Sequence, residues 1–416
     1  MKLKNLTHWL LKINNYLAGQ LLIKLVDFFT AIIVLRALSI TEYALYIIAG
    51  SLLTVGSMIS DLGLSQAIIT LGSKHQNNLP YLGSLINAAK KYRQKFYLVA
   101  LILVTILMPI MTKEHGWNVL NISYCLILIL ISNWFQQNVS FNNSILNIHH
   151  DSKGLFNAGM VTSLVRLILT ITLCRTSPQA VIILLINLIG VITNGVTLSF
   201  LCKKYISEKA TSDFKEQDIK RFIMPLIPGI TYFTFQGNIS TFFLTLLGTT
   251  KAVAQFGALG RLGQIIGFVG MLNPFFIQPY FARLTSKKDF FKKCFIVIVF
   301  LIIFIGTLLI SSYTVPDLWL LILGNQYSNL KNELPVAILA GSLSLCTGVL
   351  YFITISRSTK GQAYGVLINL TIITCFVFLN PITTVKDGFL LNILVECGYI
   401  LLEIIILSRL IATWKK

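Results

Sequence analysis

The sequence consists almost entirely of long apolar stretches separated by short polar segments. A helix needs about 20 mostly apolar residues to cross the hydrocarbon core of a bilayer. Lipid offers the backbone no hydrogen-bond partners, so stretches of this length form helices rather than the strands of a barrel. The sequence predicts an all-α polytopic membrane protein with about twelve transmembrane helices, at Leu17–Leu38, Tyr43–Leu62, Phe96–Thr112, Leu120–Val139, Leu155–Cys174, Ala180–Leu201, Phe222–Leu247, Ala252–Phe276, Cys294–Ser312, Leu334–Ile355, Ala363–Leu379 and Gly388–Ile411.

The composition excludes a soluble globular enzyme and a disordered chain. Of the 416 residues, 55% are apolar and only 12% are charged, against about 25% charged in an average soluble domain. The net charge of +19 comes from basic residues that lie between apolar runs, which indicates orienting charge and contact with anionic lipids rather than nucleic acid. The seven cysteines and five histidines show no metal-ligand spacing, so we expect no metal site.

The distribution of Lys and Arg predicts the orientation in the membrane. With the amino end in the cytoplasm, 25 of the 34 basic residues fall in inner segments, six in outer loops and three within the spans. Such an excess on one side is typical of the cytoplasmic face. We therefore expect both termini to be cytoplasmic.

The chain is predicted to divide into two halves. An amphipathic cytoplasmic segment (1–16) precedes six spans in 17–202, a charged cytoplasmic linker follows at 203–221, and the remaining six spans occupy 222–416. The segment Leu35–Ala49 is echoed by Leu246–Gly260 after a shift of about 210 residues. With six spans in each half, such repeats would be parallel, although chance similarity between apolar segments is an alternative.

Three short motifs near the amino end resemble a known family. The first span ends in Leu35–Leu38 (LRAL), the second begins with Glu42–Tyr46 (EYALY), and it ends in Asp61–Leu64 (DLGL). This pattern resembles the opening of the polysaccharide and O-antigen flippases of the multidrug/oligosaccharidyl-lipid/polysaccharide (MOP) exporter superfamily. The second half resembles that family more loosely, through Lys251–Gln264 and the proline-containing Asn273–Leu284. The sequence departs from the family pattern at Ala44, where a glycine is common.

The resemblance implies both an architecture and a function. The architecture would be a V-shaped pair of six-helix lobes around a central cavity. The function would be that of a bacterial inner-membrane flippase, not an enzyme, that moves an undecaprenyl-diphosphate-linked oligosaccharide unit, such as one of O-antigen for lipopolysaccharide, to the periplasmic leaflet. The implied partners are that lipid-linked substrate, membrane lipids, a polysaccharide polymerase and a chain-length regulator. No cofactor is expected beyond a coupling proton or sodium ion.

Cationic residues within the spans are the first candidates for substrate binding. An ionisable side chain at membrane depth costs roughly 2.5–3.5 kcal/mol on insertion scales and needs a partner or a function. Arg166, Arg261 and Lys24 lie in predicted spans, and a guanidinium suits the oxygens of a diphosphate. The alternative is a structural role, in which the arginines pair with Asp27 or Glu396.

Acidic residues within or beside the spans are candidates for ion coupling. Asp27 lies three residues after Lys24, so the two share a helix face and could instead neutralise each other. Asp61 ends the second span, and Glu396 lies two helical turns before Glu403 in the last. We assign Asp27, Asp61 and Glu396 as ion-coupling candidates.

Amide side chains and prolines complete the candidate features. Gln136, Gln236 and Asn238 lie among aromatic residues in predicted spans, which suits sugar hydroxyls, although hydrogen bonds between helices explain them equally. Prolines at 225, 228, 274 and 279 are expected to kink their helices.

Three other functions remain open from the sequence. A cation-coupled drug or small-molecule antiporter of the same superfamily would favour acids and aromatics in its cavity over the three cations found here. A membrane polysaccharide polymerase would carry a large outer loop with catalytic groups, and a channel would show a repeated filter motif.

Overall fold

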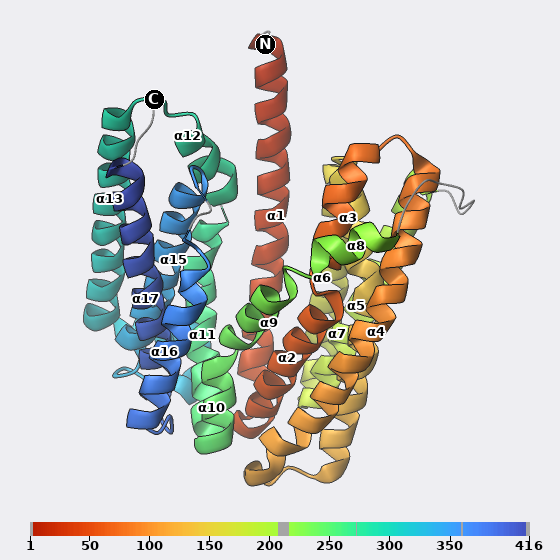
Figure 1. Ribbon diagram of the computed structural model, residues 1–416. Helices are drawn as coiled ribbons and strands as arrows, with labels where there is room; N and C mark the ends of the chain where they lie inside the picture. The colour runs from red at the N-terminus through yellow and green to blue at the C-terminus, as the bar shows by residue number, and fades with distance from the viewer. Residues whose placement is uncertain (1–2, 207–215, 272, 359–360, 413–416) are drawn as a thin grey trace. The chain divides into compact units, whose positions relative to one another are not determined.

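The regular structure of the chain is helical throughout the described residues. The computed structural model describes residues 3–206, 216–271, 273–358 and 361–412 (Figure 1), and no strand occurs in these ranges. The first helix, α1 (Leu3–Ala37), joins the predicted amphipathic segment and the first span into one continuous helix. The side chains of 3–17 and linker residues 207–215 lie outside the described part of the chain.

Two compact units make up the chain, residues 1–239 and 240–416. In the first unit, α5 packs against α7, α2 against α4 and α5, and α6 against both α1 and α7. The short helices α3 and α8 cover one end of this bundle, where Ile219 and Ile223 of α8 join a buried apolar cluster. After α1, the helices of this unit are α2 (Ile40–Asp61), α3 (Leu64–Gly72), α4 (Leu79–Thr112), α5 (Val119–Ile148), α6 (Ser152–Thr176), α7 (Ala180–Cys202), α8 (Glu216–Ile223) and α9 (Ile227–Gln236), with short 3-10 turns at Ser73–His75, Lys113–His115 and Lys203–Tyr205.

The second unit is built around α15, which packs against α11, α13 and α17. Its backbone comes so close to α11 that a Cβ added to Gly341 would lie 3.0 Å from the Cα of Gly263. Small residues at such crossings let helices pack tightly in a membrane. The helices from the unit boundary onward are α10 (Ile239–Leu247), α11 (Thr250–Gly270), the π-helical turn η4 (Asn273–Ile277), α12 (Gln278–Ala282), α13 (Lys287–Thr314), α14 (Pro316–Leu323), α15 (Leu334–Ile355), α16 (Tyr364–Leu379) and α17 (Val385–Ala412), with a 3-10 turn at Asn325–Tyr327.

The predicted count of twelve spans is not confirmed. Ten helices in the described residues are long and apolar enough to cross a membrane. The predicted span Phe222–Leu247 is not one helix. Its first two residues end α8, a turn follows at Met224–Leu226, and α9 and α10 come after the turn. Pro225 lies in that turn and Pro228 lies in the first turn of α9, and proline cannot donate the helical hydrogen bond. Predicted span Ala363–Leu379 is present as α16, which has only 16 residues.

The internal echo corresponds to one helix junction that occurs twice. Between α1 and α2, the side chain of Ser39 accepts a hydrogen bond from the backbone N–H of Glu42 at 3.3 Å. Between α10 and α11, Thr249 caps Ala252 in the same way at 3.2 Å. Both pairs are separated by 210 positions, and both capping residues are extended, as an N-cap requires. The junctions therefore support a duplicated origin for the two halves.

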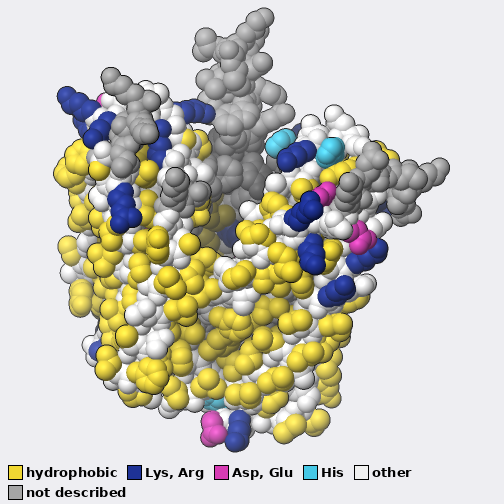
Figure 2. Space-filling view, viewed as in Figure 1, with side chains coloured by type: hydrophobic (Ala, Val, Ile, Leu, Met, Phe, Trp, Pro, Cys, Tyr) yellow, Lys and Arg dark blue, Asp and Glu magenta, His cyan; other side chains and the backbone are white. Residues whose placement is uncertain are grey.

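Apolar side chains cover the flanks of both units. On α13, Phe295, Phe300, Ile302 and Ile310 are each about 60% or more exposed, far more than water would favour on one helix. Figure 2 shows apolar flanks on each unit and basic side chains gathered toward one end of each. The surface is that of a protein whose sides face lipid, as the composition predicts.

A polar corner anchors the start of α6. Asp151 accepts hydrogen bonds from the backbone N–H of Gly154 (3.0 Å), from Lys204 Nζ (3.0 Å) and from the Tyr205 hydroxyl (3.1 Å). Burial alone would raise the pKa of the Asp151 carboxyl, but these hydrogen bonds and the charge of Lys204 outweigh it and lower that pKa. The ring of His149 stacks on Tyr205 at 4.1 Å. The carboxylate thus fixes both the N-terminus of α6 and the end of α7.

We predict that Asp151→Ala destabilises the protein by about 1–2 kcal/mol, because a helix cap and two side-chain contacts are lost. Thermal unfolding of the purified protein in detergent measures the effect. Since the native pKa is lowered, the stabilisation is complete above the unfolded-state value of about 3.9 and is lost as pH falls through the native pKa. The difference in unfolding temperature between Asp151→Ala and the wild type should therefore become smaller at acidic pH.

Glu333 provides the control for this prediction. It occupies the N-cap position of α15, and its side chain makes no capping hydrogen bond. Glu333→Ala should leave the unfolding temperature unchanged. An equal loss in both variants would contradict the role assigned to Asp151.

Candidate functional site

A cluster of polar side chains links α1, α6 and α7 in the middle of the first unit. Arg166 on α6 donates from Nη2 to the Asn187 side-chain oxygen on α7 at 2.6 Å. Its Nη1 lies 3.8 Å from a carboxylate oxygen of Asp27 on α1. The same carboxylate oxygen accepts a hydrogen bond from the Ser163 hydroxyl at 2.8 Å. Three helices therefore contribute to one half-buried charged site.

Gly190 makes room for the arginine. A Cβ at this position of α7 would lie 2.6 Å from Cδ of Arg166, which is closer than such atoms approach. The Nε of Arg166 is buried and has no hydrogen-bond partner among the described residues, yet 33% of its side chain remains accessible. Arg166 is thus held by Asn187 and Asp27, while its side chain is only partly buried.

The structure pairs Asp27 with Arg166 rather than with its neighbour on α1. Lys24 is exposed, and none of the ion pairs among the described residues includes it. The helix-face pairing of Lys24 with Asp27, considered from the sequence, is therefore absent from the described contacts. The alternative in which Arg166 pairs with Asp27 is present, although the pair is only partly buried.

The Asp61–Leu64 motif folds as a corner between two helices. Leu62 and Gly63 both adopt left-handed backbone conformations, with φ of 37° and 85°. Glycine suits the second position because a side chain there is strained, and an added Cβ would also lie 3.1 Å from Ile230. The turn brings Asp61 back onto the first turn of α3, where its carboxylate accepts a bond from the Ser65 hydroxyl at 2.6 Å.

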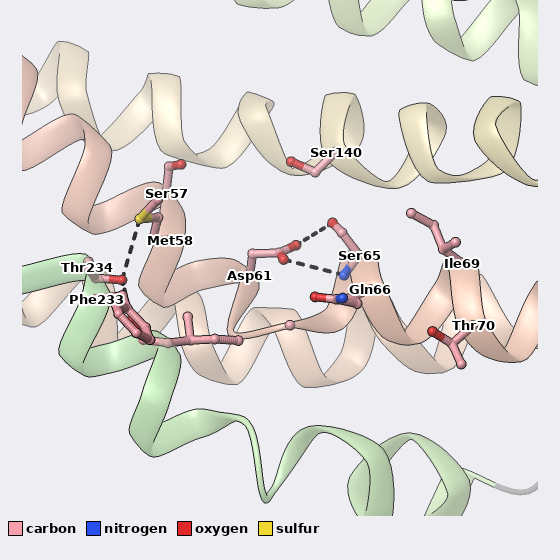
Figure 3. Close-up of a pocket in the computed structure, with 12 residues that line it drawn as sticks. Ser57, Met58, Asp61, Ser65, Gln66, Ile69, Thr70, Ser140, Phe233 and Thr234 are labelled. Atoms are coloured by element: carbon pink, nitrogen blue, oxygen red, sulfur yellow. Dashed lines mark hydrogen bonds between the residues drawn. The ribbon is translucent and has the colours of Figure 1, made fainter. Parts of the chain in front are cut away.

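A cavity of about 640 Å³ opens beside this corner (Figure 3). Asp61 lies in its wall, and Figure 3 shows the hydrogen bonds from the backbone and side chain of Ser65 to its carboxylate. The Thr234 hydroxyl of α9 lies 3.5 Å from the sulfur of Met58 at one end of the cavity. The polar lining groups are one carboxylate, several hydroxyls and one amide, from Ser57, Asp61, Ser65, Gln66, Thr70, Ser140 and Thr234.

Arg93 is a buried cation in a stretch that was predicted to be an inner segment between two spans. It lies within α4, is 1% exposed, donates to the backbone oxygen of Gln137, and places its guanidinium 4.7 Å from the ring of Phe141. It also interacts electrostatically with Asp61. The helix register could have revealed it, because Arg93 continues the buried series Leu82, Ile86, Ala89, Tyr97, Ala100, Val104 and Met108.

The predicted sugar-binding amides lie on α5 and at the end of α9. Gln136 is half-buried on α5, and Gln236 ends α9. Asn238 donates to the backbone oxygen of Thr234 at 3.1 Å. The cavity lining includes none of the three and instead contains Gln66, which the sequence analysis did not single out. Gln66 lies five residues after Asp61 of the motif, and this nearness to the motif was the sequence feature that could have indicated its place in the cavity wall.

The second unit holds the other predicted residues. Arg261 on α11 is half-buried, and its Nη1 lies 3.3 Å from the side-chain oxygen of Gln264. Glu396 on α17 faces the hydroxyls of Ser344 and Thr347 on α15. Two turns further along α17, Glu403 is fully buried against the same helix. In the part of the chain that the structure describes, no group of three His, Cys, Asp or Glu side chains is arranged to hold a metal.

The fold is similar to those of solved transporters. An inward-facing multidrug resistance transporter of the MATE family and MOP superfamily is 13% identical, with a TM-score of 0.66 over 94% of this chain and 95% of that one. A mutant of the Vibrio cholerae MATE transporter VcmN gives 15% and 0.60 over 95% and 94%. The eukaryotic MATE transporter AtDTX14 gives 12% and 0.52 over 94% and 96%. At these identities the likeness concerns the fold alone.

A sequence comparison gives the family. Residues 12–285 match the family described as "Polysaccharide biosynthesis protein", and the chain belongs to this family. No curated protein sequence matches the chain. Family and fold together confirm the predicted resemblance, and they place the chain among multi-pass membrane transporters rather than enzymes.

We predict that the half-buried pair of Asp27 and Arg166 contributes more to stability than a fully exposed pair. A double-mutant cycle with Asp27→Asn and Arg166→Gln, read by thermal unfolding, should give a coupling of about 0.5–1 kcal/mol. The control cycle uses Lys331 and Asp317, which are 2.7 Å apart but 53% and 75% exposed, and it should give a smaller value. A stronger coupling in the exposed pair would contradict the structural importance of the α1–α6 contact.

Proposed function

We propose that this protein is a flippase for an undecaprenyl-diphosphate-linked oligosaccharide, such as an O-antigen repeat unit, in the bacterial inner membrane. The substrate would move from the cytoplasmic to the periplasmic leaflet by alternating access. The excess of basic residues in the inner segments supports cytoplasmic termini. A polysaccharide polymerase and a chain-length regulator are the partners that such a role would require downstream.

The half-buried side chain of Arg166 and its position among α1, α6 and α7 are the observation that carries this proposal. Arg166 lies in the middle of a membrane-spanning helix, and Asn187 and Asp27 hold it in place while a third of its side chain stays accessible. A diphosphate carries about two negative charges, and the planar fork of arginine matches its oxygens. Arg261 on α11 is the candidate for a second contact, and exposed Lys24 for a third.

The remaining predicted residues have secondary roles in this proposal. Gln136, Gln236 and Asn238 would contact sugar hydroxyls, as would the hydroxyl-rich cavity beside Asp61. Asp27, Asp61 and Glu396 are the candidates to bind a coupling proton or sodium ion. A cation-coupled antiporter for small molecules is the second candidate function, favoured by the MATE-type fold, and it predicts drug resistance rather than glycan export.

We predict that Arg166→Ala and Arg261→Ala each abolish export of the glycan while protein levels stay near normal. Arg→Lys should restore export only in part, because the two-pronged contact with phosphate is lost. The assay is surface glycan in cells that lack their own flippase. Arg175→Ala is the matched control, since Arg175 is exposed in the last turn of the same helix as Arg166. Normal export by both Ala variants would exclude the phosphate-binding role.

We further predict that flipping responds to membrane voltage without an ion gradient. Moving one charge across 100 mV is worth about 2.3 kcal/mol, so expelling a head group of about two negative charges from a negative interior gains roughly twice that. Asp27→Asn should remove dependence on a proton or sodium gradient and retain part of the voltage dependence. The measurement is exposure of the glycan lipid on the outer face of vesicles under a potassium-diffusion potential. Voltage-independent flipping by the wild type would mean that a co-transported cation neutralises the head group.

A further inference from the structure

A buried carboxylic acid in the second unit has only neutral hydrogen-bond partners. Glu403 on α17 is 1% exposed and Thr354 on α15 is 0% exposed. Glu403 Oε2 is in short hydrogen-bond contact with the Thr354 hydroxyl, and it lies 3.3 Å from Nε2 of Gln362. None of the ion pairs among the described residues includes Glu403. Burying a charged carboxylate without a cationic partner costs free energy, so the charge state of Glu403 needs an explanation.

The single hydroxyl hydrogen of Thr354 cannot serve all of its hydrogen-bond contacts. Its hydroxyl oxygen lies within hydrogen-bond distance of the backbone oxygen of Tyr351 (3.0 Å) and of Glu403 Oε2, and it accepts from Gln362 Nε2 at 3.2 Å. A hydroxyl carries a single hydrogen, and the Tyr351 oxygen can only accept. Both contacts are full two-centre hydrogen bonds at once only if Glu403 itself carries a proton and donates it to Thr354, because a deprotonated Glu403 would have to share the single Thr354 hydrogen with Tyr351.

We propose that Glu403 is a reversible proton-binding site whose proton switches the Thr354 hydroxyl between two acceptors. In the protonated state, Glu403 donates to Thr354 Oγ1, and the Thr354 hydrogen turns to the Tyr351 backbone oxygen. In the deprotonated state, the proton leaves Glu403, and the Thr354 hydrogen turns to the carboxylate. One proton is bound or released, and Gln362 remains a donor in both states.

The surroundings favour a proton over a metal cation. Gln362 presents an N–H to Glu403, and that group would repel a cation, whereas it stabilises a carboxylate. Arg357, the nearby loop cation, donates to the backbone oxygens of Phe281 and Leu284 instead. The titratable neighbours are Tyr351 on α15 and, on α17, Glu396 two turns away and Arg409 near the end. α16 contains no charged residue, and α11 carries Lys251 and Arg261.

Gln362 connects the buried acid to the protein surface. It is half-exposed and lies in the segment between α15 and α16, close to the ends of these helices that carry basic residues. Among the groups described, Gln362 is the polar contact that leads from the buried acid toward the surface. A proton would be exchanged on the face predicted to be cytoplasmic. Because the site belongs to the protein alone, it can be tested without any glycan.

Infrared difference spectroscopy of the purified protein in lipid nanodiscs tests the proposal. On raising pH, the wild type should lose one protonated-carboxyl band that Glu403→Gln lacks from the outset and that Glu396→Gln retains. Asp317→Asn, which removes an exposed acid of the same unit, should leave the band unchanged. A band that persists in Glu403→Gln, or a wild type without such a band, would overturn the assignment.

Two further variants separate a proton switch from a purely structural contact. Thr354→Ser keeps the hydroxyl and should keep the pH profile of the band. Thr354→Val removes the hydroxyl oxygen that accepts the hydrogen bond from protonated Glu403, and it should shift that profile. These variants keep the carboxyl, so they remain informative if Glu403→Gln does not fold. Equal profiles for Ser and Val would overturn the switch. A band that disappears when sodium replaces choline at constant pH would identify the ligand as sodium and overturn the proton assignment.

Discussion

The hydrocarbon core of a bilayer holds no water, so each polar group in a spanning helix depends on the protein for a partner. Hydroxyls meet this demand within their own helix, as Thr162 does by donating to the backbone oxygen of Ala158 at 2.8 Å. The ionisable side chains of Asp27, Arg166 and Glu403 are instead matched across helices. Asp27 and Arg166 join α1 to α6, and Glu403 joins α17 to α15. These polar contacts fix which faces of the helices meet, whereas apolar packing alone would let the helices slide past one another.

The same constraint explains where the helices break. Proline leaves a carbonyl without its usual N–H partner, and the chain places prolines at the turn before α9 and in the π-helical turn Asn273–Ile277. Elsewhere the chain turns where a side chain caps the next helix, at Ser39 and again at Thr249. A side-chain cap satisfies a backbone N–H that would otherwise lack a partner, so a capped turn can lie at the edge of the membrane. The same cap occurs at the corresponding junction of each half, as a duplicated origin of the halves predicts.

Much of the fold could be predicted from hydropathy, because a spanning helix must be apolar over its length. The span Leu334–Ile355 was predicted to the residue. Hydropathy failed where helices extend beyond the bilayer-length window. The third span was expected to begin at Phe96, whereas α4 begins at Leu79 and therefore includes Arg93. The site was predicted less well, because the sequence shows which charges lie at depth but not which helices meet. Asp27 could therefore be assigned to Lys24 or to Arg166, and only packing of α1 against α6 decides between them.

The contact between Asp27 and Arg166 has a consequence for the proposed transport cycle. One guanidinium serves both the carboxylate and, in the proposal, the substrate diphosphate. A diphosphate that draws Arg166 away leaves Asp27 with Ser163 as its hydrogen-bond donor and with an uncompensated charge. A proton or cation would then bind Asp27 more favourably than before. Coupling between two ligands is reciprocal, so occupation of Asp27 would in turn free Arg166 for the diphosphate. Gly190 leaves the arginine space in its present position beside α7, and a single shared side chain is enough to link ion binding at Asp27 to substrate binding at Arg166.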